Sequence, residues 1–333
     1  MDIRNRRGLK DAARESLAYA SYDPRKLVLI HTLAAVALTL AVTVLDFFLG
    51  DRIADTGGLG GLGLRSILST IQSVLRLVNM VLLPFWEVGY IYAAMNIARG
   101  REAKPDSLLE GLRRWSVVLR SNLLQTILYF CVGMACYYLA MTLFLMTPLS
   151  GPLQTLVAPY LNDPNALLAD PALSAAVMEA SIPMFVIFLV IFAVLALPMV
   201  YHFRMTNYAL LDNPKAGAFA ALRRSKFLMH GDRFALFRLD LSFWWFYAAQ
   251  ALLSVICYGD VLLELLGVKL PFSDTTGFFL FYILSLVLQV ALYTFARNRV
   301  AVTYVHAYES LGGSIEDDPT PAPAPQRNQP WQY

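Results

Sequence analysis

The chain has 333 residues, of which 57% are hydrophobic and only 15% are charged, and its formal net charge is +3 at pH 7. A soluble domain carries about 25% charged residues, so this composition excludes an ordinary soluble protein and predicts several membrane-spanning helices. The net charge is small, and the informative feature is therefore where the charges lie.

A charged segment of 26 residues precedes the first apolar run. Within it we expect a basic amphipathic helix over residues 8–20. The apolar run then extends from Leu27 to Leu49. It is longer than the apolar region of a signal peptide and has no small-residue cleavage site after it, so we expect it to remain as a span.

Six apolar runs are long enough to cross the hydrocarbon core, which takes about 20 helical residues. They are Leu27–Leu49, a stretch within Ile67–Ala98, Asn122–Met146, Pro183–Phe203, Leu241–Tyr258 and Phe278–Phe295. None alternates between apolar and polar residues, as a barrel strand would. The sequence therefore predicts an all-α fold, a polytopic membrane helix bundle of six transmembrane helices with cytoplasmic amphipathic helices.

The basic residues avoid every second connecting segment. In chain order, the seven segments divided by the six runs carry 7, 3, 6, 0, 7, 1 and 3 Lys or Arg residues. The odd-numbered segments thus hold 23 and the even-numbered ones hold 4. Because positive residues accumulate in cytoplasmic loops, we expect six crossings with both the N-terminus and the C-terminus in the cytoplasm.

Residues 215–229 form a second basic amphipathic helix in this interpretation. We expect Phe219, Leu222 and Phe227 to face lipid while nearby basic side chains meet headgroups. The predicted headgroup-contacting residues are Arg113, Arg114, Arg223, Arg224 and Lys226. Their position beside membrane spans favours anionic lipids as the partner and argues against nucleic acid.

A repeated unit of one basic helix and two spans is also consistent with the sequence. The three candidate helices are residues 8–20, 105–117 and 214–229, and each precedes a pair of spans. Alternatively, cytoplasmic loops before spans simply resemble one another. The domains we expect are the N-terminal segment 1–26, the membrane domain 27–310 and a disordered, Pro-rich tail 311–333.

Glu87 is the most informative intramembrane residue. It lies twelve residues before Arg99, about 18 Å along a helix, and Pro84 can kink that helix. A carboxylate at this depth costs about 2.5 kcal/mol or more, so it should face a partner or a cavity. Two readings stay open: a proton or cation site, or a carboxyl that joins helices through Asn79 or Gln289.

The remaining polar residues predict no chemical site. The glycine-rich stretch 58–63 formally matches G-x-G-x-x-G but lacks the strand and helix of a dinucleotide fold. The cysteines and histidines have no metal-ligand spacing, and no nucleophile with a base is evident. We therefore expect no catalytic residue, no metal and no cofactor. We expect Arg297 and Arg299 to be boundary residues whose side chains extend to the membrane surface.

Several stretches together resemble a known family. They are RRGLKDAARESL before the first span, IYAAMNIARGREAKPDSLLEGLRRW after the second, SKFLMHGDRFALFRLDLSF before the fifth, and AYESL at residues 307–311. The chain is similar to the bacterial integral membrane family called domain of unknown function 975, over most of residues 5–311. It departs from the family pattern at Trp244 and Trp245. The resemblance implies a bacterial plasma-membrane protein and supplies no activity and no site residues.

These observations favour a non-enzymatic plasma-membrane protein with a structural or partner-organising role. Its partners would be anionic lipids and other membrane proteins or further copies of itself. The alternative is a small transporter or channel-like protein that uses Glu87 in a polar path. A membrane-embedded enzyme acting on lipid is a third reading, and it would need several polar groups converging at one interface.

Overall fold

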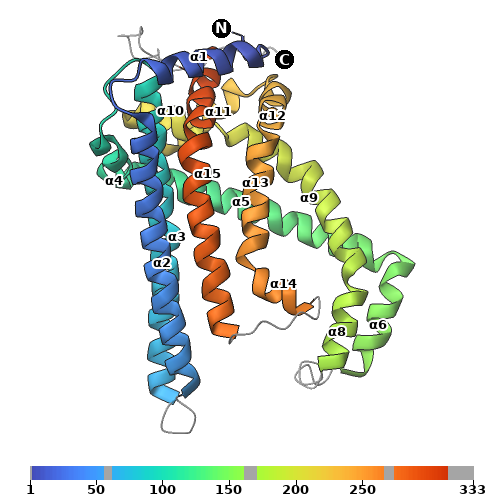
Figure 1. Cartoon of the computed structure of the whole chain (residues 1–333). Coiled ribbons are helices and arrows are strands. Elements are labelled where there is room, and N and C mark those ends of the chain that lie inside the picture. Colours follow the sequence, from blue (N-terminus) through green and yellow to red (C-terminus); the bar gives the residue numbers. More distant parts are fainter. Residues whose placement is uncertain (1, 56–61, 161–170, 266–273, 314–333) are drawn as a thin grey trace.

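The computed structural model describes residues 2–55, 62–160, 171–265 and 274–313, and all regular structure in these ranges is helical (Figure 1). The glycine-rich stretch lies mostly outside the described residues, as does nearly all of the C-terminal tail.

Five helices are long and apolar enough to span a membrane. They are α2 (Pro24–Asp55), α3 (Leu62–Ala98), α5 (Trp115–Leu145), α9 (Ile182–Phe203) and α15 (Asp274–Ser310). Each contains one of the predicted apolar runs, except that α5 ends one residue before Met146, and α3 continues through Pro84 without interruption. Helix α15 continues well past Arg299, so the sixth run is only part of a longer helix.

The predicted fifth span is not one straight helix. Helices α12 (Arg233–Leu241) and α13 (Trp244–Cys257) are bent by 65° at Ser242–Phe243, and only together do they qualify as a sixth span. Alone, the 14 residues of α13 extend about 21 Å, which is too short for the hydrocarbon core. Composition predicted the apolar run correctly, but it could not reveal the break.

Short helices gather at the end of the molecule that holds both ends of the described chain (Figure 1). They are α1 (Arg6–Ala18), η2 (Pro105–Leu109), α4 (Glu110–Arg113), α10 (Thr206–Asp212), α11 (Gly217–Leu228) and α12. We call this the α1 end. Helices α6 (Gly151–Val157), α8 (Pro171–Ala180) and α14 (Gly259–Leu265) lie toward the opposite end.

The predicted helix over residues 105–117 is not continuous. Pro105 opens the 3₁₀ turn η2, α4 follows for one turn, and the chain turns again at Arg114 before α5 begins. By contrast, α1 and α11 agree closely with the helices expected over residues 8–20 and 215–229.

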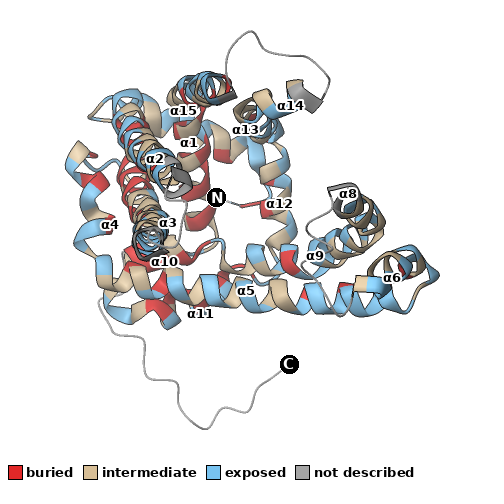
Figure 2. Cartoon of the chain, turned by 90° about the horizontal axis from the view of Figure 1, so that it is seen from below, coloured by how far each residue is buried: buried red, intermediate tan, exposed pale blue. Residues whose placement is uncertain are grey.

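The long helices pack in consecutive pairs: α2 with α3, α5 with α9, and α13 with α15. Helix α15 also packs on α1, α2 and α3. Seen along the helices, α5 and α9 extend away from the other four together with α6 and α8 (Figure 2). The three-fold repeat stays a prediction, because the elements that precede the three pairs differ in form.

The main buried core lies at the α1 end, and the opposite halves of the long helices are largely exposed, apart from a few buried positions such as Cys136 and Phe144 of α5. The core cluster draws on α1, the last part of α3, α10, α12 and the last part of α15. Farther from this end, large apolar side chains such as Leu77, Phe130, Leu189 and Leu284 are exposed. Apolar helices without protein cover are what a hydrocarbon environment accommodates, so this distribution fits a polytopic membrane protein.

Helix α1 is held by the protein itself. Leu9 and Ala13 on its apolar face are buried, and Asn5 caps its first turn through Gly8 N at 3.1 Å. The Lys10 ammonium donates to the Ser242 carbonyl at 2.9 Å and lies 4.2 Å from the centre of the Phe243 ring. Burial lowers the pKa of Lys10. Lys10 thereby joins α1 to the bend between α12 and α13.

Candidate functional site

Glu87 forms an ion pair with Arg297, and these two residues join α3 to α15. The Arg297 side chain is only 13% exposed, whereas the Glu87 side chain is 49% exposed. Arg297 is therefore enclosed by protein and Glu87 supplies its counter-charge from a more open position. The predicted boundary role of Arg297 is wrong, because its side chain turns inward to Glu87.

His31 of α2 completes this cluster. Arg297 Nη1 lies 3.4 Å from His31 Nδ1, and His31 Nε2 lies 3.3 Å from the Trp86 carbonyl oxygen. The Trp86 indole in turn donates to the His31 carbonyl at 2.9 Å. Because arginine can only donate, this network favours the neutral tautomer with its proton on Nε2. His31 is fully buried, so it acts as a packed histidine that links α2, α3 and α15.

Two tyrosine rings sandwich the Arg297 guanidinium. Its carbon lies 4.5 Å from the centre of the Tyr90 ring and 4.7 Å from the centre of the Tyr293 ring. The Tyr90 hydroxyl donates to Asn298 Oδ1 at 2.9 Å, and the Asn298 amide donates to the Pro24 carbonyl at 2.6 Å. Cation–π contacts with desolvated rings add about 2 kcal/mol to such a site.

Neither amide predicted as a partner of Glu87 forms that contact. Asn79 Oδ1 is buried without a hydrogen-bond partner among the described residues. Gln289 lies on α15 two turns before Arg297, where it lines a separate cavity. Counting residues along one helix gives a depth, but it cannot tell which residue of a distant helix faces that depth.

The Glu87–Arg297 pair predicts a non-additive effect on stability. Glu87→Gln should lower the melting temperature of the purified protein, because Arg297 remains charged and enclosed without its carboxylate. Removing one partner of a buried pair costs about 3–5 kcal/mol, and the exposure of Glu87 places this variant at the lower end. The double variant E87Q/R297Q should recover part of that loss in a thermal unfolding cycle. Additive losses would show that the two groups do not interact.

A second network lies at the α1 end and joins α3, α10 and α15. Arg99 contacts Asp212 at 2.7 Å and Glu309 at 3.0 Å, and the Tyr308 hydroxyl donates to the other Asp212 oxygen at 2.8 Å. His306 approaches Glu309 at 3.5 Å. Burial acts to lower the pKa of Arg99, but its bonds with the two carboxylates outweigh that effect and the pKa is raised.

The five basic residues predicted to contact headgroups differ in their surroundings. Arg114 is bound internally, to Glu110 at 2.6 Å and to the Leu211 carbonyl at 3.2 Å. Arg224 donates to the Gly313 carbonyl at 2.8 Å. Arg113 is 59% exposed and lies 3.6 Å from Glu110. Internal acceptors close to Arg114 and Arg224 compete with lipid, and the sequence alone could not show them.

Arg223 and Lys226 are exposed and share one face of α11 with two phenylalanines. Phe219 is 75% exposed and Phe227 is 79% exposed, and the helical spacing places all four side chains together. No ion pair of Arg223 or Lys226 occurs among the described residues. Leu222, which we expected to face lipid, is instead buried at 7% exposure, because it lies at the edge of the buried face of α11, beside Ala218 and Ser225.

The structure contains a third polar contact that the sequence did not predict. The Tyr201 hydroxyl donates to Asp240 Oδ2 at 2.6 Å, which ties α9 to α12. Nothing in the sequence around Asp240 points to α9. No group of three His, Cys, Asp or Glu side chains that could hold a metal ion occurs in the part of the chain that the structure describes.

A comparison of the sequence with models of protein families identifies the family of this chain. The model of the family described as "Protein of unknown function (DUF975)" matches residues 1–296. The chain belongs to the DUF975 family. No curated protein and no solved structure matches this DUF975 protein. Its apolar helices, five or six of which can span a membrane, support the membrane character that the resemblance implied.

Proposed function

We propose that this DUF975 protein is a non-enzymatic, multi-span protein of the bacterial plasma membrane with a structural or partner-organising role. Its basic helices at the α1 end would contact anionic lipids, and it would associate with other membrane proteins or with itself, not with nucleic acid. The single observation that carries the proposal is the exposed face of α11, where Phe219, Arg223, Lys226 and Phe227 lie together.

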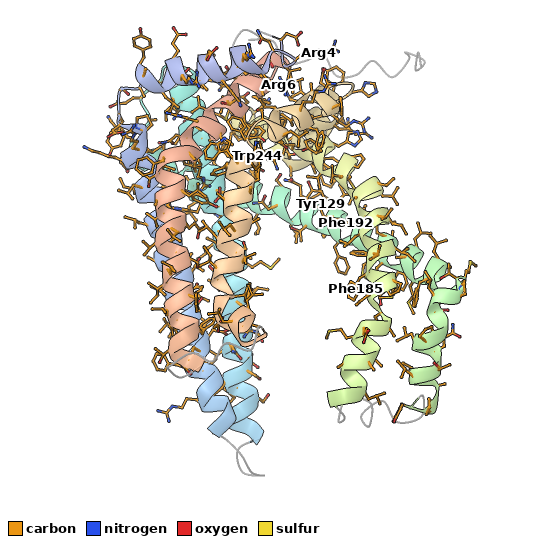
Figure 3. All side chains as sticks on the ribbon, turned by 45° about the vertical axis from the view of Figure 1, so that its right-hand side comes forward. Arg4, Arg6, Tyr129, Phe185, Phe192 and Trp244 are labelled. Atoms are coloured by element: carbon orange, nitrogen blue, oxygen red, sulfur yellow. The ribbon has the colours of Figure 1, made fainter. Side chains whose placement is uncertain are left out.

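That face has the chemistry of a surface for anionic lipid. Two exposed aromatic side chains can enter the acyl boundary while two cations remain with the headgroups. Trp244, 67% exposed at the start of α13, lies further from the α1 end than Arg4 and Arg6 (Figure 3). Interfacial tryptophans mark the edge of the hydrocarbon, so the bilayer would begin near Trp244 and α11 would rest on its surface.

Removing both cations of α11 should weaken the preference for anionic lipid. Near the surface each Lys or Arg contributes about 1 kcal/mol, so R223Q/K226Q should lose about 2 kcal/mol, or about 30-fold in affinity for phosphatidylglycerol. The variant and the original protein are each placed in nanodiscs that contain both phosphatidylglycerol and phosphatidylcholine. Native mass spectrometry then measures the ratio of bound phosphatidylglycerol to bound phosphatidylcholine.

The matched control is R6Q/R7Q, which removes the same charge from α1 at the far edge of the α1 end (Figure 3). It should change the ratio much less. Equal losses in both double variants would mean that net charge, and not the α11 face, attracts the lipid, and would remove the basis of the proposal.

The orientation that we propose places the α1 end in the cytoplasm, and it is supported by the distribution of Lys and Arg along the sequence. Single cysteines at Ala158 and Lys226, each exposed, should report opposite sides in a variant without native cysteines. A membrane-impermeant maleimide should label A158C in intact cells and K226C only after permeabilisation. The buried neighbour Ser225 is unsuitable, because its hydroxyl bonds Met205 N at 3.1 Å and the His202 carbonyl at 2.8 Å. Labelling of K226C from outside would reverse the topology.

The transporter-like alternative rests on Glu87, whose side chain is half exposed within the spans. Its ion pair with Arg297 gives the carboxylate a joining role, and this favours the structural reading. The variant E87Q separates the two functions. Loss of solute flux in reconstituted vesicles at unchanged melting temperature would support transport, whereas a lowered melting temperature supports the structural role.

A further inference from the structure

Polar side chains of α13 and α15 face each other along most of the length of these two helices. Near the α1 end the hydroxyls of Tyr247 and Tyr304 lie 3.0 Å apart. About one turn further along α13, the Gln250 amide donates to the Tyr293 hydroxyl at 3.0 Å. Tyr293 also stacks on Arg297, so this polar seam is continuous with the cluster around Glu87.

Beyond these contacts the seam opens into a cavity of about 450 Å³ between α2, α13 and α15. Its polar lining includes Thr39 of α2, Gln250 and Ser254 of α13, and Ser285 and Gln289 of α15. Rings of three tyrosines and the Cys257 thiol complete much of the wall. The volume is in the range of small-molecule sites and far exceeds the space of a single water.

The lining retains much unused hydrogen-bonding capacity. The hydroxyls of Thr39, Ser254 and Ser285 each donate to a carbonyl of their own helix, which leaves their oxygens free to accept. The structure shows no hydrogen bond of the Gln289 amide within the described residues. Within apolar spans such groups are unfavourable unless water or a ligand satisfies them.

The lining also selects the class of ligand. The described cavity wall contains no Asp, Glu, Lys, Arg or His. A charged ligand would lose its hydration without gaining a counter-charge, which is costly in a membrane interior. An uncharged molecule with many hydroxyls could instead pair with the amides and hydroxyls while its apolar faces rest on the tyrosine rings.

We propose that this cavity binds an uncharged, polyhydroxylated molecule, such as a sugar or the sugar headgroup of a glycolipid, within the membrane-spanning layer. Water fills the cavity when the ligand is absent. The proposal is independent of the lipid-contacting role of α11, because the two sites share no residue.

Cys257 provides a native reporter for this site. The full chain in nanodiscs is treated with 2-hydroxyethyl methanethiosulfonate, an uncharged hydrophilic thiol reagent, and modification is quantified by peptide mass spectrometry. Cys257 should react because its cavity is hydrated, and Cys131, exposed on the apolar surface of α5, should react much more slowly. An unreactive Cys257 in the folded protein would overturn the proposal.

Two arms identify the source of the ligand. Glucose is added to plain phosphatidylcholine nanodiscs in one arm, and glucosyl diacylglycerol is built into the nanodiscs in the other. At ten times its dissociation constant a ligand leaves about a tenth of the sites open, so labelling should slow about tenfold in at least one arm. Protection by glucose indicates a free solute, and protection only by the glycolipid indicates a headgroup.

Gluconate is the matched control, because it has the hydroxyls of glucose together with a carboxylate. It should not protect Cys257, and Gln289→Leu should abolish protection by the effective sugar while the melting temperature stays unchanged. Equal protection by gluconate, no protection in either arm, or full protection of a folded Q289L variant would each contradict the proposal.

Discussion

Replacing Gly89 with alanine is expected to prevent this protein from folding normally. A Cβ atom on Gly89 of α3 would lie far inside van der Waals contact with the backbone carbonyl of Leu108 in η2. The same approach is seen from the other side, where a Cβ on Gly111 would strike the carbonyl of Phe85. Both obstacles are backbone atoms, so no side chain can rotate away and two helical segments would have to separate.

Overpacking of a core typically costs about 1–3 kcal/mol, and backbone clashes belong at or above the upper end of that range. For G89A and G111A we therefore expect a marked loss of folded protein, measured as the monodisperse fraction in size-exclusion chromatography and as the melting temperature. Gly133→Ala is the matched control, because it lies inside α5 with open space around its Cβ position. It should be neutral or gain about 0.5–1 kcal/mol. A folded, stable G89A would disprove the close approach of α3 and η2.

The second large effect is expected at Arg99. Arg99→Leu leaves the carboxylates of Asp212 and Glu309 without their cation at the junction of α3, α10 and α15. The Asp212 side chain is only 6% exposed, so its charge cannot recover full hydration. Breaking a buried network in this way costs about 3–5 kcal/mol. Thermal unfolding in detergent should show a large decrease in melting temperature.

A matched arginine distinguishes this network from a general effect of charge. Arg223→Leu removes an exposed guanidinium of α11 and should change stability by less than about 0.5 kcal/mol. The melting temperature of Arg99→Lys should lie between those of R99L and R223L, because one ammonium cannot reproduce the two directed contacts of the guanidinium. Equal melting temperatures for R99L and R223L would show that the Arg99 network contributes nothing to stability.

The spans could be predicted from the sequence because hydrocarbon thickness imposes a simple length requirement on apolar runs. The bounds of α9 and the presence of α2, α3, α5 and α15 follow from that requirement alone. The break at Ser242–Phe243 did not, because it falls at the very start of the apolar run 241–258 and Lys10, which bonds to the bend, lies on a helix more than 200 residues away.

The candidate sites were predictable only in part. Glu87 stood out because a carboxylate inside a span requires a partner. Its partner, Arg297, was misread because α15 extends past the expected boundary and carries that arginine inside the protein. The cavity beside Gln289 was invisible, since its polar residues come from three helices and each looks ordinary in its own run. Leu222 was expected to face lipid because it is apolar and close to Phe219 and Lys226 along the helix, and only the packing shows that it is buried.

The concentration of the core at the α1 end has a consequence for how the molecule is completed. Over the far halves of α3, α5 and α9 many large apolar side chains are exposed and only a few, such as Cys136, Ala140 and Phe144 of α5, are buried, so lipid acyl chains would cover most of this apolar surface. In this DUF975 protein the lipid would therefore act as part of the structure around the far halves of the helices. At the α1 end the surrounding solvent would only border a core that the protein forms by itself. Changes in the thickness and fluidity of the bilayer would therefore act on the far halves of these helices, while the α1 end, which contains the buried core, would keep its shape.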